Sequence, residues 1–185
     1  MKKLLLLLAL AVSGTSSLQA MPAQVIIIRH GEKPLKGNDL DTKGKERAAA
    51  LAPFFLGTPL LQKFGLPVAV YAQRPSSEDP SMRPIQTATP IAEALGIKVN
   101  TTYQHLQFAR MAQEIRTRPE FHGKVVLVAW EHHVIPELAR KLGAKNAPKK
   151  WDGDVFDRLW VITYDGSQVL FQDLPQRLLY GDSPR

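Results

Sequence analysis

The sequence predicts an α/β protein whose central sheet is mainly parallel and is covered by helices on both faces. Three apolar runs, at residues 25–28, 68–72 and 124–130, are typical of buried strands. Segments of helical character separate them, and strands that alternate with helices favour a parallel sheet. Two late strands around Asp165 and Gly166 predict an antiparallel hairpin. We therefore expect a three-layer sandwich of helices, sheet and helices.

Each remaining element has its own local signal. Asp41 or Thr42 can cap the first helix, and Pro53 lies near the expected end of that helix. Gly96 and Gly143 mark the ends of two later helices. Helices are expected at residues 45–51, 85–96, 107–117 and 136–142, and the shorter strands at 97–99, 159–164 and 168–171.

Length and composition restrict the classes of protein. A chain of 185 residues with 44% apolar content fits one globular domain, which we place at residues 21–185. The chain contains no Cys, which excludes disulfides, thiolate zinc sites, iron–sulfur clusters and a cysteine nucleophile.

The first twenty residues have the three regions of a secretory signal peptide. Lys2 and Lys3 precede an apolar stretch at residues 4–12 that is too short to span a bilayer, and Ala20 is a suitable small residue before a cut. We expect residues 1–20 to be removed, leaving a periplasmic or secreted protein without stable membrane association. An uncleaved membrane anchor is the alternative.

The formal net charge of +7 falls to +5 without Lys2 and Lys3. The basic residues are scattered among acids, which favours a solvated surface over a nucleic-acid stripe, so no nucleic-acid partner is expected. Small anionic substrates would still be attracted to such a surface.

Groups that can hold an anion follow several of the predicted strands. Arg29 and His30 end the first strand, Arg83 stands at a helix entrance, and His132 follows a later strand. The carboxyl ends of parallel strands lie at one edge of a sheet, where ligands collect. Residues that are distant in sequence can therefore converge on one oxyanion pocket.

The same residues resemble the motifs of the histidine phosphatase superfamily, in its phosphoglycerate mutase-like branch. The resemblance covers most of the chain after residue 20 and rests on three motifs in order: Arg29-His30-Gly31-Glu32, Ser81-x-Arg83-x-x-Gln86-Thr87-Ala88 and Glu131-His132.

This resemblance implies a phosphomonoester hydrolase of the histidine acid phosphatase type, and the predicted signal peptide makes it an exported one. His30 would attack phosphorus and become transiently phosphorylated, while Arg29 and Arg83 would bind the phosphoryl oxygens. Protonated His132 would donate to another oxygen, so that no metal or cofactor is needed. The substrate would be a phosphorylated small molecule or glycan.

The chain departs from the family pattern in two places. His133 stands where the late motif usually has Gly, so that either His132 or His133 could enter the pocket. The family's proton donor has no clear match; Glu131 is the best candidate, with Asp154 and His105 behind it. Glu32 is expected to hold the first loop in place.

Two other functions are compatible with these residues. In the first, Glu131, His132, His133 and His30 ligate a divalent ion of a metal-dependent hydrolase; adjacent residues of a strand point to opposite faces, which disfavours it unless the loop bends. In the second, the protein is a catalytically weak phosphate-binding module.

Overall fold

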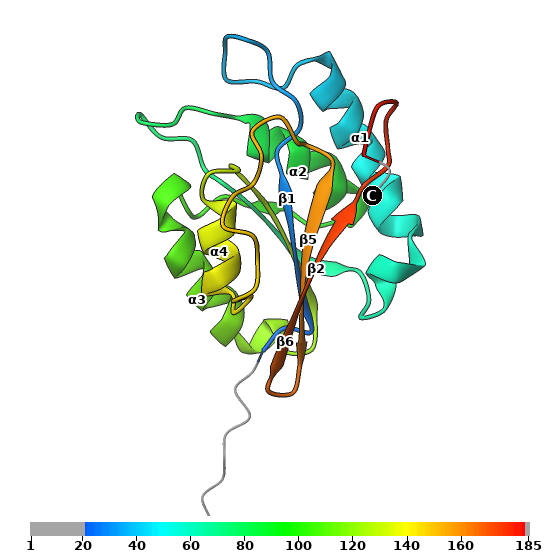
Figure 1. Cartoon of the computed structure of the whole chain (residues 1–185), viewed down its shortest axis with the longest axis vertical. Coiled ribbons are helices and arrows are strands. Elements are labelled where there is room, and N and C mark those ends of the chain that lie inside the picture. The colour runs from blue at the N-terminus through cyan, green and yellow to red at the C-terminus, as the bar shows by residue number, and fades with distance from the viewer. Residues whose placement is uncertain (1–20, 184–185) are drawn as a thin grey trace, which may run out of the picture.

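A six-stranded sheet runs through the centre of the molecule in this computed structural model, which describes residues 21–183 (Figure 1). The strand order is β3-β2-β4-β1-β5-β6. The strands β1, β2, β3 and β4 pair in parallel, whereas β5 is antiparallel to β1 and β6 is antiparallel to β5. The predicted signal peptide lies outside the described residues.

The described elements follow the predicted order. The strands are β1 (Gln24–Arg29), β2 (Pro67–Ala72), β3 (Val99–Asn100), β4 (Val125–Trp130), β5 (Arg158–Asp165) and β6 (Gln168–Pro175). The α-helices are α1 (Thr42–Gly57), α2 (Arg83–Ala94), α3 (Phe108–Thr117) and α4 (Ile135–Lys141), with short 3₁₀ turns at Pro59–Gln62, His105–Gln107 and Pro119–Phe121.

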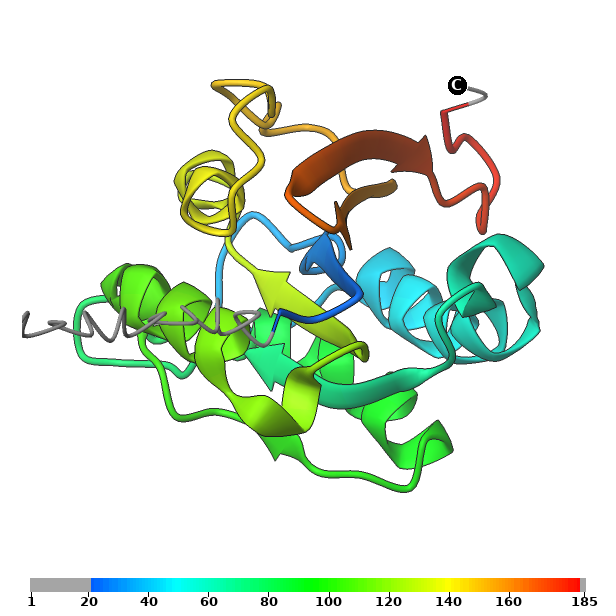
Figure 2. The same ribbon diagram turned by 90° about the horizontal axis from the view of Figure 1, so that it is seen from below.

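Helices cover both faces of the sheet, as Figure 2 shows, and this confirms the three-layer arrangement. Every residue of β1 is buried, and alternate side chains of the strand point into the hydrophobic cores on the two faces of the sheet. Ile27 packs in the core that includes residues of α3 and α4, whereas Ile28 packs in the core that includes Leu51 of α1 and Ile91 of α2. The continuous apolar run of the strand is thus explained by burial from both sides.

The helix α1 passes through Pro53 and continues to Gly57, beyond the end that we expected. Asp41 caps its start, accepting a hydrogen bond from the Gly44 amide at 2.7 Å. A proline cannot donate to the carbonyl four residues earlier, but Ala49 and Pro53 are both exposed, so water can reach that carbonyl. The burial of Phe55 one turn later favours continuation of the helix.

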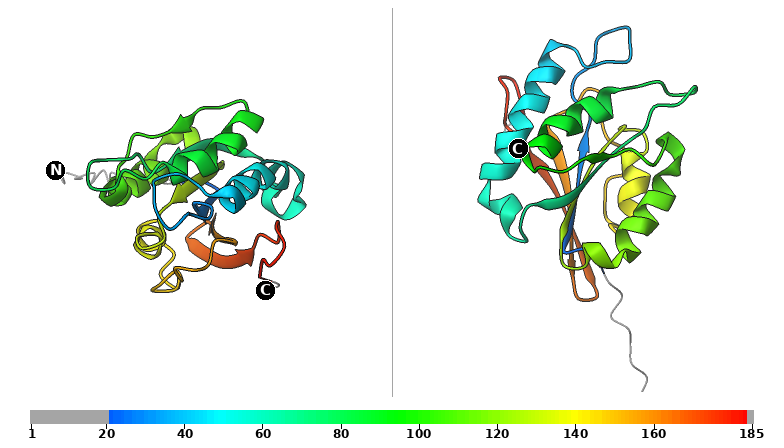
Figure 3. Two further views of the ribbon diagram at one scale, coloured as in Figure 1. Left: turned by 90° about the horizontal axis from the view of Figure 1, so that it is seen from above. Right: turned by 180° about the vertical axis from the view of Figure 1, so that it is seen from behind.

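The chain after β6 returns to α1 (Figure 3). Asp182 and Gln176 accept hydrogen bonds from the buried guanidinium of Arg47, at 2.7 and 3.0 Å.

Among the described helices, none has the length and apolar character needed to cross a bilayer.

Candidate active site

His30 lies directly after β1 and is only 2% exposed. Its Nδ1 atom is 2.7 Å from the carbonyl oxygen of Gly31. Because a carbonyl only accepts, Nδ1 carries the proton and the lone pair resides on Nε2. Burial, with smaller contributions from the charges of Arg29 and Arg83, lowers the pKa of His30 to about 3, although the hydrogen bond to Gly31 raises it. His30 is therefore neutral at pH 7 and can act as a nucleophile through Nε2.

The guanidinium of Arg29 is fully buried beside this imidazole. Its Nη1 atom donates to the carbonyl oxygens of Gly153 at 2.7 Å and Val155 at 2.9 Å, and its plane stacks on Phe156 at 3.7 Å. Burial lowers its pKa to about 10, so it is charged at neutral pH. Its Nε and Nη2 atoms have no hydrogen-bond partner among the described residues. Two unpaired donors on a rigid fork suit an oxyanion.

Arg83 is the first residue of α2 and is half-buried. Its Nη1 atom donates to the Gly37 carbonyl at 3.0 Å, and its Nε atom is buried without a partner in the described part of the chain. Its positive charge lowers the pKa values of both His30 and Arg29. Arg83 of the second motif therefore lies at the same edge of the sheet as the first motif.

The other residues of the second motif connect α2 to the loop after β1. Thr87 accepts a hydrogen bond from the Gly31 amide at 2.9 Å and donates to the Arg83 carbonyl at 2.8 Å. Gln86 accepts from the Leu40 amide at 2.8 Å. The sequence motif contained Thr87 and Gln86, but only the structure shows that these residues fix the loop after β1 against α2.

His132 and His133 follow β4, in a turn between the strand and α4. His132 is 8% exposed, whereas the His133 side chain is 77% exposed. A Cβ placed on Gly153 would lie 3.6 Å from His132 Nε2, and the Gly153 carbonyl also holds Arg29. The buried imidazole at this edge is therefore that of His132, and His133 lies outside.

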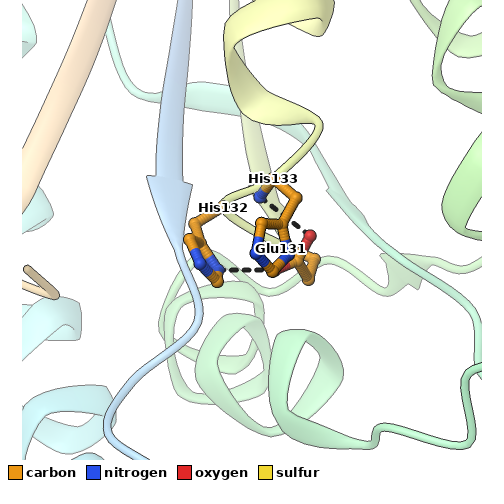
Figure 4. A group of neighbouring side chains, drawn as sticks. All are labelled: Glu131, His132 and His133. Carbon is orange, nitrogen blue, oxygen red and sulfur yellow. Dashed lines mark hydrogen bonds and ion pairs between the residues drawn. The ribbon is translucent and has the colours of Figure 1, made fainter. Parts of the chain in front are cut away.

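Glu131 contacts both histidines (Figure 4). Its Oε1 atom is 2.5 Å from His132 Nδ1 and 2.8 Å from His133 Nδ1. The bend that would bring the two histidines to one side of the chain is present, because β4 ends at Trp130 and the chain turns. The two rings lie with their centroids 3.8 Å apart.

The surroundings of Glu131 disfavour a proton-donor role for this residue. Burial raises its pKa, but the hydrogen bond and charge of His132, with the His133 amide, lower it to about 2 overall. Glu131 is thus ionised and acts as an acceptor. Asp154 is exposed, and its charge supports that of Arg29. His105 lies beside two acids: its Nε2 atom is 3.5 Å from Glu131 Oε2 and its Nδ1 atom is 3.8 Å from Asp79 Oδ2.

Glu32 holds the first loop, as expected. Its carboxylate accepts from Arg47 at 2.7 and 2.9 Å. The loop packs tightly on α1, because a Cβ on Gly31 would lie 2.8 Å from the Gly44 carbonyl oxygen and one on Gly44 only 2.3 Å from that of Glu32. Both positions therefore require glycine.

The fold with this site at its carboxyl edge is that of the phosphoglycerate mutase-like proteins, as its solved structural neighbours show. The protein histidine phosphatase SixA, complexed with tungstate, is 18% identical with a TM-score of 0.55, covering 83% of this chain and 97% of its own. A phosphoserine phosphatase from Entamoeba histolytica is 14% identical with a TM-score of 0.57, covering 84% and 99%.

A phosphoglycerate mutase from Bacillus anthracis is 12% identical with a TM-score of 0.54, covering 84% of this chain and 94% of its own. No protein-family model and no curated protein matches the sequence. The neighbours belong to the histidine phosphatase superfamily, so the fold that the motifs implied is confirmed.

Proposed function

We propose that this protein belongs to the histidine phosphatases and hydrolyses phosphomonoesters through a phosphohistidine intermediate on His30. The observation that carries the proposal is the buried, neutral imidazole whose Nδ1 atom is engaged by Gly31, beside the two unpaired donors of Arg29. The structural neighbours named as phosphatases support the same chemistry.

The reaction would proceed in two displacements. The lone pair of His30 Nε2 forms an N–P bond while the P–O bond to the substrate alcohol breaks, and the departing oxygen takes a proton from a general acid, for which His105 is the candidate, and which regains a proton from the attacking water in the second step. Water then attacks phosphorus, which releases inorganic phosphate and restores neutral His30. Arg29, Arg83 and His132 would stabilise the charge on the phosphoryl oxygens in both steps.

The proposed substrate is a phosphorylated small molecule or glycan, and the proposed type is an acid phosphatase. A nucleophile with a pKa of about 3 stays neutral in acidic solution, which supports operation at low pH.

We further propose export after cleavage behind Ala20, as the sequence of residues 1–20 indicates. Intact mass of protein recovered from the periplasm or medium tests this, with a mature chain that starts at Met21 as the expected result.

Trapping of the intermediate tests the central proposal. Brief reaction with a ³²P-labelled phosphomonoester should label the protein with an acid-labile, base-stable phosphoryl group, and His30→Ala should abolish both label and turnover. The matched control is His122→Ala, which removes an exposed histidine outside the site. Full turnover by His30→Ala would refute the proposal, and stoichiometric phosphate binding without turnover by the unaltered protein would identify a phosphate-binding module instead.

A further inference from the structure

Two consecutive imidazoles and one carboxylate face one another at the end of β4. The Nδ1 atoms of His132 and His133 both approach Glu131 Oε1, at 2.5 and 2.8 Å. One potential ligand atom from each of the three residues lies within 4.8 Å of the others. Two imidazole nitrogens and a carboxylate oxygen form a common three-residue set for zinc, with a fourth position left open.

The site is accessible from solvent on one side. The His133 side chain is 77% exposed, whereas those of His132 and Glu131 are 10% and 14% exposed. A dissolved ion could therefore meet His133 first and reach the two buried ligands by a small rearrangement. The turn after Trp130 is what brings both rings to one carboxylate, as Figure 4 shows.

We propose that Glu131, His132 and His133 bind Zn²⁺ or a similar transition-metal ion, and that this ion inhibits the enzyme. Ion binding depends only on the positions of these three residues. Inhibition rests on the proposed function, in which His132 contacts the phosphoryl group. The metal is an inhibitor in this scheme and takes no part in the reaction.

Geometry supplies the reason for inhibition. Zinc ligands at about 2.0–2.2 Å in a tetrahedral arrangement lie roughly 3.3 Å from one another. The His132 Nδ1 to Glu131 Oε1 separation of 2.5 Å must therefore widen when the ion enters. His132 would move relative to Gly153 and hence to Arg29, and a displacement of about 1 Å at a catalytic group can cost about 100-fold in rate.

Direct binding is tested with Co²⁺, whose visible absorption reports its coordination. The purified unaltered protein should take up one Co²⁺ with a shift of these bands, and Zn²⁺ should displace it. His133→Ala should weaken binding at least about 10-fold, since loss of even an outer-shell partner has such an effect. The control His122→Ala, an exposed histidine elsewhere, should bind as the unaltered protein does. Equal binding by His133→Ala would overturn the site.

Inhibition is measured with p-nitrophenyl phosphate, relative to the metal-free rate of each variant. Zn²⁺ should inhibit the unaltered protein reversibly, EDTA should restore the rate, and His133→Ala should need at least about 10-fold more Zn²⁺. Equal inhibition of both would overturn the inhibitory role, as would activity that EDTA abolishes and Zn²⁺ restores, which indicates a metal-dependent hydrolase. If no variant hydrolyses any phosphomonoester, the proposed function fails, and the Co²⁺ titration decides the site by itself.

Discussion

The side chain of His30 is buried, and its Nδ1 atom donates to a carbonyl oxygen 2.7 Å away. Burial disfavours the charged imidazolium, and the two nearby arginines add to this effect. The nitrogen that we propose as the nucleophile is thus kept unprotonated by the same packing that orients it. A solvated histidine would be largely charged in acidic solution.

The protonation of His30 can be followed by NMR. A pKa lowered to about 3 means that the second proton, on Nε2, is bound mainly below this pH, so the ring should remain neutral from pH 7 down to pH 4. The ¹⁵N shifts of the ring, assigned by comparison with His30→Asn, should keep the pattern of the Nδ1-protonated form over this range. A midpoint near 6.5 would show that the imidazole is solvated.

In the proposed reaction, His105 is the candidate for supplying the proton to the leaving group, because its Nε2 atom lies 3.5 Å from Glu131 Oε2. With Glu131 ionised, a donor from the neighbouring loop is needed for poor leaving groups. We expect His105→Gln to lower kcat for phosphoserine by about 10²- to 10⁴-fold, the usual worth of a general acid. The rate with p-nitrophenyl phosphate, whose leaving group needs no proton, should change much less. Equal losses with both substrates would assign His105 a structural role only.

At the scale of elements, the loop after β1 is held between two helices. Thr87 of α2 binds the Gly31 amide, and α1 approaches so closely that its Gly44 contacts the backbone of Glu32. The position of His30 is therefore set by helix packing on one face of the sheet.

Substitution of Gly44 tests this dependence. In Gly44→Ala the new Cβ would lie 2.3 Å from the Glu32 carbonyl oxygen, so the loop must shift, and a displacement of about 1 Å can lower kcat by about 100-fold. Gly57→Ala at the other end of α1 meets no atom within 4 Å and should retain normal kinetics. The measurement is kcat of both variants; normal kcat in Gly44→Ala would mean that the loop tolerates the shift.

At the scale of the whole molecule, Arg47 connects the site loop, α1 and the C-terminal segment. Its side chain is 1% exposed and pairs with Glu32 and Asp182, each at 2.7 Å. Burial lowers the pKa of Arg47, but the two carboxylates raise it overall. The pKa of Asp182 is in turn about 2, because the effect of burial is outweighed by Arg47 and the Leu179 amide.

Removal of this guanidinium would leave Asp182 without its charged partner and Glu32 with only the half-exposed Lys43, whose Nζ atom is 3.8 Å from Glu32 Oε1. We expect Arg47→Ala to lower the free energy of unfolding by about 3–5 kcal/mol, measured by urea denaturation. Arg140→Ala, which removes an ion pair with Glu137 at the surface, should have a much smaller effect. Similar losses in both variants would show that the buried network contributes no more than a surface pair.

The sequence by itself determined the fold class, the order of the elements and the edge of the sheet where Arg29, His30, Arg83 and His132 gather. These follow from local patterns, since buried strands are apolar throughout and parallel strands end at one edge. Asp41 and Gly96 likewise marked helix ends through their immediate chemistry.

Only the tertiary structure decided which histidine is buried, which nitrogen of His30 is free, and that Glu131 is ionised. Each depends on atoms distant in sequence or on a turn that no local pattern specifies. Gly153, for example, lies in a loop more than a hundred residues after β1, yet it accepts a hydrogen bond from Arg29 and lies close to His132. Burial and hydrogen bonding, which set protonation, exist only after the chain has folded.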